Sequence, residues 1–145
     1  MYRYANILTT VRNVANRVVI LSGVISGGRT GSSRLPSYNS KTTLVLMMCV
    51  RKIREFTNKM MKDLGYPSDL GVAVVHKMSL HDQIVLRSDV ENIADVVRDQ
   101  EMSSPAVFVI GNVTKDRFGN GVYVMFPDVG VDVVDGKEEA KFSGK

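Results

Sequence analysis

The sequence predicts an α/β fold in which a mixed β-sheet is flanked by helices. Three observations lead to this prediction. Short apolar runs, several of them rich in valine and isoleucine, have the length and composition of buried strands. Two other segments repeat apolar residues at helical spacing. Strands and helices alternate along the chain, and continuous apolar runs favour parallel or mixed pairing because both faces of such strands are buried.

The first predicted strand covers residues 18–21, a β-branched run that stops at a Ser-Gly pair. Residues 23–39 are rich in glycine and serine, which predicts a loop, and this loop carries Arg29 and Arg34. The second strand is expected at 42–48, where every position but the first two is apolar.

A helix is expected at about 50–64, because apolar residues recur on one face and basic residues occupy the other. Gly65 suits the position after a helix end, and Pro67 prevents the helix from continuing. A second helix is predicted to start at Ser88. There Ser88 serves as the N-cap and Glu91, three residues later, completes a capping box.

Three further strands are predicted at 71–75, 83–87 and 105–111, which gives the element order β, β, α, β, β, α, β. A last strand is expected at 122–126. The acidic and basic tail at 135–145 has too few apolar residues for a core, so we expect it to be disordered.

Composition limits the class of protein. The 145 residues are 44% hydrophobic and 23% charged, which is normal for a globular domain and excludes a collagen-like fibre or a coiled coil. The single cysteine, Cys49, excludes internal disulfides and favours a reducing compartment. No apolar run reaches the roughly 18–20 residues of a membrane span, and the first residues do not resemble a signal peptide. These features together predict a cytoplasmic protein.

Charge is distributed unevenly along the chain. Residues 1–60 contain ten Lys and Arg against one acid, a net +9, whereas residues 61–145 contain nine against fourteen, a net −5. A basic half suggests an anionic partner, such as nucleic acid, a membrane surface, phosphate or a small polycarboxylate. The alternative is a solvated, solubilising face. The basic helix lacks exposed aromatic residues and any recognised nucleic-acid module, so neither nucleic acid nor a membrane is the expected partner.

Individual residues identify no catalytic side chain. His76 and His81 lie five positions apart without a third ligand at useful spacing, so no metal site is predicted. Cys49 is interpreted as a small packed residue. The glycine-rich segment at 22–31 matches neither a P-loop nor a dinucleotide-binding loop. In open α/β sheets ligands bind at the carboxyl ends of strands, which directs attention to the turn at Met48 and the turn after Val75.

Four stretches, taken in order, resemble motifs of one enzyme family. Residues 6–15 (NILTTVRNVA) are similar to GIPLTHRGVA, and residues 43–49 (TLVLMMC) to TLVxYMG. Residues 72–79 (VAVVHKMS), with Gln83 after them, are similar to VAVVExGTxxxQ, and residues 104–113 (SPAVFVIGNV) to SPALIVVGxV. The family is that of the uroporphyrinogen-III C-methyltransferases, the tetrapyrrole methylases of sirohaem biosynthesis.

This resemblance implies a fold like the C-terminal lobe of the tetrapyrrole methylases over residues 1–113, followed by a divergent tail at 114–145. It implies S-adenosyl-L-methionine as cofactor and methylation of uroporphyrinogen III to precorrin-2 as the activity. It also implies a homodimer, because family members are homodimers. The alternative is an interaction or dimerisation domain that has lost catalysis.

The resemblance assigns three site residues. Met48 matches a methionine whose backbone contacts the cofactor, and Met78 stands where the family has a glycine with the same role. Arg12 matches an arginine near the substrate cleft, although Val11 replaces the family histidine beside it. The glycine-rich V-G-x-G-P-G-D and G-G-D-P segments of the family's N-terminal lobe do not occur in the sequence. The chain therefore resembles half of an active site, inactive alone, and a further lobe or a second chain is an expected partner.

Overall fold

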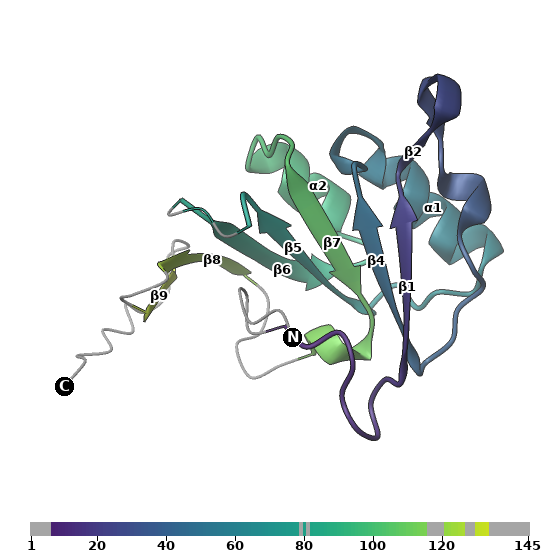
Figure 1. Cartoon of the computed structure of the whole chain (residues 1–145), viewed down its shortest axis with the longest axis horizontal. Coiled ribbons are helices and arrows are strands. Elements are labelled where there is room, and N and C mark those ends of the chain that lie inside the picture. Colours follow the sequence, from purple (N-terminus) through teal and green to yellow (C-terminus); the bar gives the residue numbers. More distant parts are fainter. Residues whose placement is uncertain (1–6, 79, 81, 116–120, 127–129, 134–145) are drawn as a thin grey trace.

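The computed structural model describes residues 7–78, 80, 82–115, 121–126 and 130–133, the last two ranges as backbone only. Within these residues, seven strands form one sheet, and two α-helices pack on one of its faces (Figure 1). In spatial order the strands are β1 (Arg17–Ser22), β4 (Thr42–Met47), β7 (Ala106–Ile110), β5 (Gly71–His76), β6 (Ile84–Asp89), β8 (Gly121–Phe126) and β9 (Gly130–Val133).

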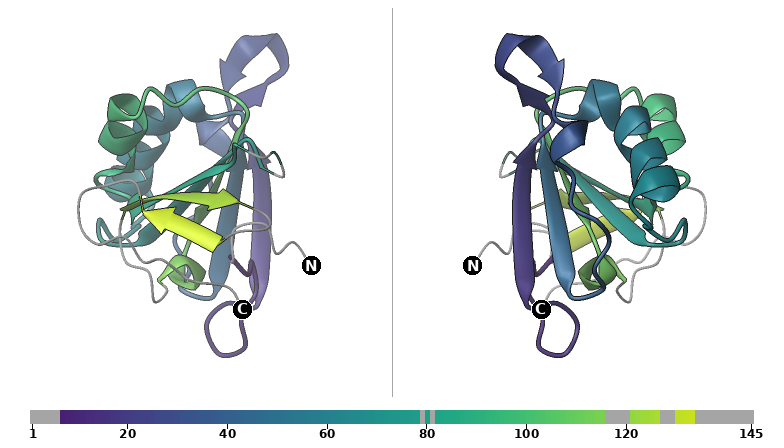
Figure 2. Two further views of the ribbon diagram at one scale, coloured as in Figure 1. Left: turned by 90° about the vertical axis from the view of Figure 1, so that its left-hand side faces the viewer. Right: turned by 90° about the vertical axis from the view of Figure 1, so that its right-hand side faces the viewer.

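The sheet is mixed, as the sequence predicted. Strands β1 and β4 are parallel, and all other neighbouring pairs are antiparallel. The predicted loop at 23–39 contains a short antiparallel pair, β2 (Val24–Ile25) and β3 (Arg29–Thr30). This β2–β3 arm projects beyond the end of β1 (Figures 1 and 2). The described residues also form four 3₁₀ turns: η1 (Ser26–Gly28), η2 (Ser32–Arg34), η3 (Val50–Lys52) and η4 (Asn112–Thr114).

The main core lies between the sheet and the two helices, α1 (Ile53–Asp63) and α2 (Ile93–Asp99). Helix α1 buries Phe56 and Met60 completely, and the sheet contributes Leu46 and Phe108 to the same cluster. Apolar residues at helical spacing on α1 therefore face apolar residues at alternate strand positions, and burial of each large side chain contributes about 1.5–3 kcal/mol.

The other face of the sheet is partly covered by the chain before β1. Ile7 packs there against the alternate residues of β5, β6 and β7, including Ala73, Val85 and Val109. Near β1 and β4 this helix-free face is open, and Ile20 and Met47 are exposed on it. Both views in Figure 2 show the helices on one side of the sheet only.

The second helix begins later than predicted. Ser88 is buried in β6, where it pairs with Val72 of β5, and α2 starts at Ile93. The predicted capping box of Ser88 and Glu91 is therefore wrong. Instead, Asp89 Oδ1 accepts a hydrogen bond of 2.9 Å from the backbone N–H of Asn92, in the turn that precedes the helix.

The strand predicted at 122–126 is present as β8, which pairs with β6, and β9 follows it at the edge of the sheet. Both strands lie in the segment at 114–145 that the sequence analysis separated from the lobe at 1–113. The domain boundary at residue 113 stays a prediction. The tail at 135–145, which we expect to be disordered, lies outside the described residues. Neither described helix has the length and apolar composition that crossing a membrane requires.

Candidate functional site

Three parallel strands end at one edge of the sheet. Strand β4 is parallel to β1, and because β7 runs antiparallel to both β4 and β5, β5 has the same direction as β4. The carboxyl ends of β1, β4 and β5 therefore share an edge, which we call the carboxyl edge. This is the edge at which open α/β sheets bind ligands. The two turns that the sequence singled out, after β4 and after β5, both lie on it.

Met48 forms the turn after β4. Its φ of 54° is in the left-handed region that few residues other than glycine adopt. This conformation turns the chain sharply from β4 into η3 and leaves the Met48 side chain 59% exposed. Non-glycine residues in this region persist where the surrounding structure fixes them, and they cluster at functional sites.

The end of β1 approaches this turn very closely. The backbone N–H of Gly23 donates a hydrogen bond of 2.6 Å to the carbonyl of Met47. A Cβ atom on Gly23 would lie 2.4 Å from Cys49 Cβ and 2.7 Å from the carbonyl oxygen of Met48. Glycine is therefore required here by lack of space, and it brings the two strand ends together.

Replacing Gly23 by alanine is expected to lower the free energy of unfolding by about 1–3 kcal/mol, because the added methyl group forces the Met48 turn to move. Urea denaturation measures the change. Ser33→Ala, at an exposed position nearby, is the control and is expected to stay within about 0.5 kcal/mol of the parent chain. Equal stability of Gly23→Ala and the parent would contradict the close approach.

Met78 lies in the turn after β5. The left-handed residue in this turn is Lys77, with φ of 51°, and not Met78, so a side chain at position 78 carries no such strain. The backbone N–H of Lys77 donates to the carbonyl of Pro105, at the start of β7. Lys77 also forms an ion pair with Asp82 across the turn. The Met78 side chain is exposed at the same edge as Met48.

His76, the last residue of β5, is a feature of this edge that sequence reasoning did not assign to the site. It is 8% exposed, and its Nε2 atom is buried with no hydrogen-bond partner among the residues that the structure describes. Burial lowers its pKa, the charge on Lys77 lowers it further, and Asp82 opposes both. The net effect is to favour the neutral imidazole of His76. In the sequence, the only indication that His76 belongs to the site is its position as a polar residue at the end of a valine-rich strand.

The structure places Arg12 away from Met48 and Met78. Arg12 is exposed in the turn at 11–15, which precedes the amino end of β1. The six residues of β1 span about 20 Å, so this turn and the carboxyl edge are at opposite ends of the strand. Arg29 and Arg34, by contrast, lie on the segments that leave the carboxyl edge, and both are exposed.

The β2–β3 arm and the residues that follow it are fixed to η3 and α1. Ser32 Oγ donates a hydrogen bond of 2.7 Å to Glu55 Oε1, and this bond, with one from Thr30, lowers the pKa of Glu55. Lys52 Nζ donates to the carbonyl of Gly28 at 3.1 Å. These contacts hold the arm, and with it Arg29, at the carboxyl edge.

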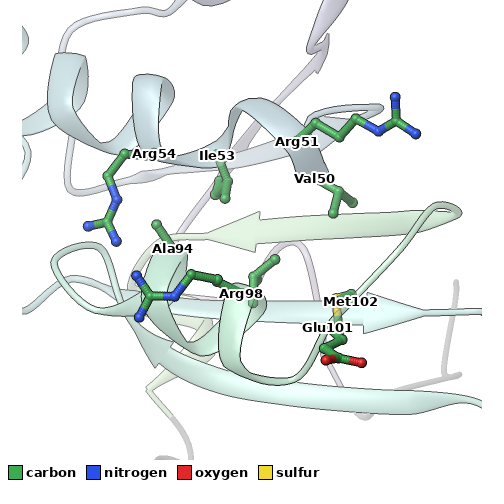
Figure 3. A pocket seen from close by; sticks show the side chains of 9 residues that line it. Val50, Arg51, Ile53, Arg54, Ala94, Arg98, Glu101 and Met102 are labelled. Atoms are coloured by element: carbon green, nitrogen blue, oxygen red, sulfur yellow. The ribbon is translucent and has the colours of Figure 1, made fainter.

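A groove of about 450 Å³ separates η3 and α1 from α2 (Figure 3). Figure 3 shows Arg54 and Arg98 directed toward the same end of it, while Arg51 extends away. Arg54 pairs with Asp95, and Arg98 pairs with Asp95 and Asp99 at 2.9 Å each. Asp95 and Asp99 thus neutralise two of the three arginines. These ion pairs link α1 to α2, and the groove is not well suited to bind an anion. Its lining residues are Val50, Arg51, Ile53, Arg54, Ala94, Val97, Arg98, Glu101 and Met102.

The described residues form neither an activated cysteine nucleophile nor a metal site. Burial raises the pKa of the Cys49 thiol to about 12, so the thiol stays protonated at neutral pH. In the described part of the chain, no three His, Cys, Asp or Glu side chains lie close enough to share a metal ion. His81, the second histidine considered above, falls outside that part.

Comparison with known proteins confirms the resemblance. No family model matches the sequence. The chain is 29% identical over 108 residues to the uroporphyrinogen-III C-methyltransferase of Saccharomyces cerevisiae. This alignment covers 74% of this chain and 18% of the yeast protein. The chain is 24% identical over 110 residues to the siroheme synthase of Psychrobacter cryohalolentis, covering 76% of this chain and 21% of that protein. The chain thus spans about a fifth of the length of these curated relatives.

Solved structures of tetrapyrrole methylases share the fold. The uroporphyrin-III C-methyl transferase of Thermus thermophilus, complexed with S-adenosyl homocysteine, matches 81% of this chain with a TM-score of 0.66 and 21% identity. A cobalt precorrin-4 methyltransferase matches 77% with a TM-score of 0.63 and 17% identity. The match covers 50% and 47% of those chains, respectively. The predicted fold class, a mixed sheet with flanking helices like part of the tetrapyrrole methylase fold, is confirmed.

Proposed function

We propose that this chain is the C-terminal part of a cytoplasmic S-adenosyl-L-methionine-dependent enzyme that methylates uroporphyrinogen III to precorrin-2. The observation that carries the proposal is the carboxyl edge. Met48 and Met78, assigned to the cofactor independently by two sequence motifs, emerge at one edge of a sheet that matches half of a methyltransferase structure. That structure contains S-adenosyl homocysteine, the demethylated form of the proposed cofactor.

The residues at this edge fit such a cofactor. Met48 turns sharply in the left-handed conformation and is 59% exposed at the carboxyl edge, where a ligand could reach it. Methionine side chains adapt to irregular apolar surfaces, which suits an adenosyl group. The buried Nε2 of His76, which has no hydrogen-bond partner in the described part of the chain, lies at the end of β5, just before the Met78 turn. When bound, the cofactor supplies an already activated methyl group, and the task of these residues is to position it.

The substrate is a macrocycle with several carboxylates, and the basic residues at the carboxyl edge suit an anion of that kind. Arg29 and Arg34 lie at this edge and are exposed, so they are placed to attract and hold carboxylates. Arg12, which the family resemblance assigns to the substrate, is at the other end of β1. Its role requires the substrate or a neighbouring lobe to reach that end.

Apolar side chains gather at the carboxyl edge and on the helix-free face beside it. Contiguous exposed apolar surface marks a place where another surface binds. We propose that a glycine-rich lobe, supplied by the same protein or by a second chain, covers this surface and completes the cofactor site. The exposed residues concerned are Ile20, Val24, Met47, Met48, Met78 and Leu80.

Calorimetry with S-adenosylhomocysteine tests the cofactor assignment. The chain alone is expected to bind weakly or not at all, and a form joined to a complete N-terminal lobe of the family is expected to bind. In the joined form, Met48→Lys is expected to weaken binding at least about tenfold, because it places a charge in an apolar site. Leu8→Lys, an exposed apolar position before β1, is the matched control. A joined protein that does not bind would contradict the assignment.

A non-catalytic interaction domain is the second candidate. Val11 and Met78 replace two residues of the family pattern, and the exposed carboxyl edge is a ready interaction surface. Under this proposal the chain keeps the sheet for binding a partner and does not methylate. Methylation of uroporphyrinogen by the 145-residue chain, measured with a radiolabelled methyl donor, would exclude it.

A further inference from the structure

The methionines whose side chains the structure describes differ sharply in exposure. Met48, Met47 and Met78 are 59%, 40% and 36% exposed, and all three lie where β4 and β5 end, at the carboxyl edge. Met60 of α1, by contrast, is fully buried, and the two remaining methionines are partly buried against the main core. The methionines most open to solvent are therefore gathered at the candidate site.

The turn at Met48 keeps this side chain outside the core. The backbone N–H of Gly23 donates to the carbonyl of Met47, and the left-handed φ of Met48 turns the chain into η3. The next two residues, Cys49 and Val50, are both buried in the main core. Because these neighbours occupy the space below the turn, the exposure of Met48 is a property of the fold.

Exposed thioether groups react with peroxides. The sulfur atom attacks one oxygen of hydrogen peroxide, an S–O bond forms, the O–O bond breaks, and the second oxygen leaves as water with both protons. The sulfur loses two electrons and the peroxide gains them. Methionine sulfoxide reductases reverse the change: two thiols become a disulfide, the sulfur regains two electrons and the oxygen leaves as water. The forward reaction requires access to the sulfur and no ionisable group.

Cys49, the neighbour of Met48, does not compete for the oxidant. Peroxide reacts with the thiolate form of cysteine and not with the thiol. Cys49 is 1% exposed, and burial raises the pKa of its thiol to about 12, so the thiol is both covered and protonated at neutral pH. At this turn the oxidisable sulfur atom is therefore the thioether of Met48.

We propose that Met48, together with Met47 and Met78, is a reversible oxidation site whose sulfoxide form prevents ligand binding at the carboxyl edge. Oxidation turns a flexible apolar side chain into a polar one, and the sulfoxide oxygen is costly to bury without a hydrogen-bond donor. An adenosyl group or a covering lobe would bury it. The oxidation site depends on exposure, whereas its effect on cofactor binding rests on the proposed function.

Treatment of the 145-residue chain with hydrogen peroxide, followed by peptide mass spectrometry, tests where oxidation occurs. Met48 is expected to oxidise at least about tenfold faster than Met60, and fragment ions separate it from the adjacent Met47. In urea, where every methionine is exposed, the rates are expected to converge. Equal rates for Met48 and Met60 in the folded chain would overturn the proposal, as would oxidation of Cys49 before Met48.

Calorimetry with S-adenosylhomocysteine, on the form joined to an N-terminal lobe, tests the effect on binding. After treatment and removal of peroxide, the affinity is expected to fall at least about tenfold, and a methionine sulfoxide reductase with dithiothreitol is expected to restore it. A variant carrying leucine at positions 47, 48 and 78 is compared with itself before and after treatment, and its loss on treatment is expected to disappear. Met61→Leu, a partly buried position in α1, is the control and is expected to show the parental loss.

Circular dichroism checks that peroxide leaves the fold intact. Unchanged affinity after complete oxidation of Met48 overturns the effect on binding, as does a loss in the triple leucine variant equal to that of the parent. A joined protein that does not bind before treatment contradicts the proposed function and, with it, this effect. The order of oxidation in the chain alone still decides whether Met48 is the oxidation site.

Discussion

Replacing Phe108 by alanine is expected to lower the free energy of unfolding by about 3–5 kcal/mol, which is a large part of the 5–15 kcal/mol typical of a domain. Phe108 is fully buried in β7, an interior strand that lies between β4 and β5 in the sheet. In register it stands between Leu46 and Val74, and the helices cover the same face. Loss of the ring leaves a cavity in the main core between the sheet and the helices.

Urea denaturation of the parent chain and Phe108→Ala measures the loss at one protein concentration. Leu80→Ala, where half of the side chain is exposed, is the control and is expected to change the free energy by under about 0.5 kcal/mol. A similar small change for Phe108→Ala would show that β7 is not the centre of the core. Loss of β7 would also separate the Met48 and Met78 turns, because β7 lies between their strands.

Alkaline pH is expected to destabilise the chain through Cys49. Burial raises the pKa of this thiol from 9.0 to about 12 in the folded protein. Between these two pH values the unfolded chain gives up a proton that the folded chain keeps, so unfolding becomes more favourable as pH rises. The contribution of Cys49 is fully present below pH 9 and falls by about 1.4 kcal/mol per pH unit, or about 4 kcal/mol by pH 12.

Comparison of the parent chain with Cys49→Ala isolates this effect, because lysines and tyrosines titrate in the same range in both proteins. Urea denaturation at pH 8, 9, 10 and 11 is expected to show a steeper loss of stability in the parent. The alanine variant is expected to be less stable at pH 8, from lost packing, and the difference to narrow as pH rises. Parallel curves for the two proteins would show that the thiol ionises normally in the folded state.

Local sequence patterns were sufficient to predict most of the helices and strands. The apolar runs predicted β1, β4, β5, β6 and β7 to within one or two residues, and the helical spacing at 50–64 predicted η3 and α1. The start of α2 was predicted wrongly, because a capping box is a local signal and pairing overrides it. Ser88 lies in β6, where backbone pairing with Val72 and burial outweigh its tendency to cap a helix.

The sequence by itself determined which turns belong to the candidate site, because residue identities at the ends of β4 and β5 carry the family motifs. It also predicted much of the core, since periodicity depends only on near neighbours along the chain. The expectation that the runs at 18–21 and 42–48 are fully buried was wrong at Ile20, Met47 and Met48, which are exposed. Only the tertiary structure decided that Met48 and Met78 share an edge, that Arg12 lies at the opposite end of β1, and that Ile20 is left uncovered. These facts follow from the order and direction of the strands, above all from β7 running antiparallel between β4 and β5. Strand order is set by contacts between distant segments, which no local pattern encodes.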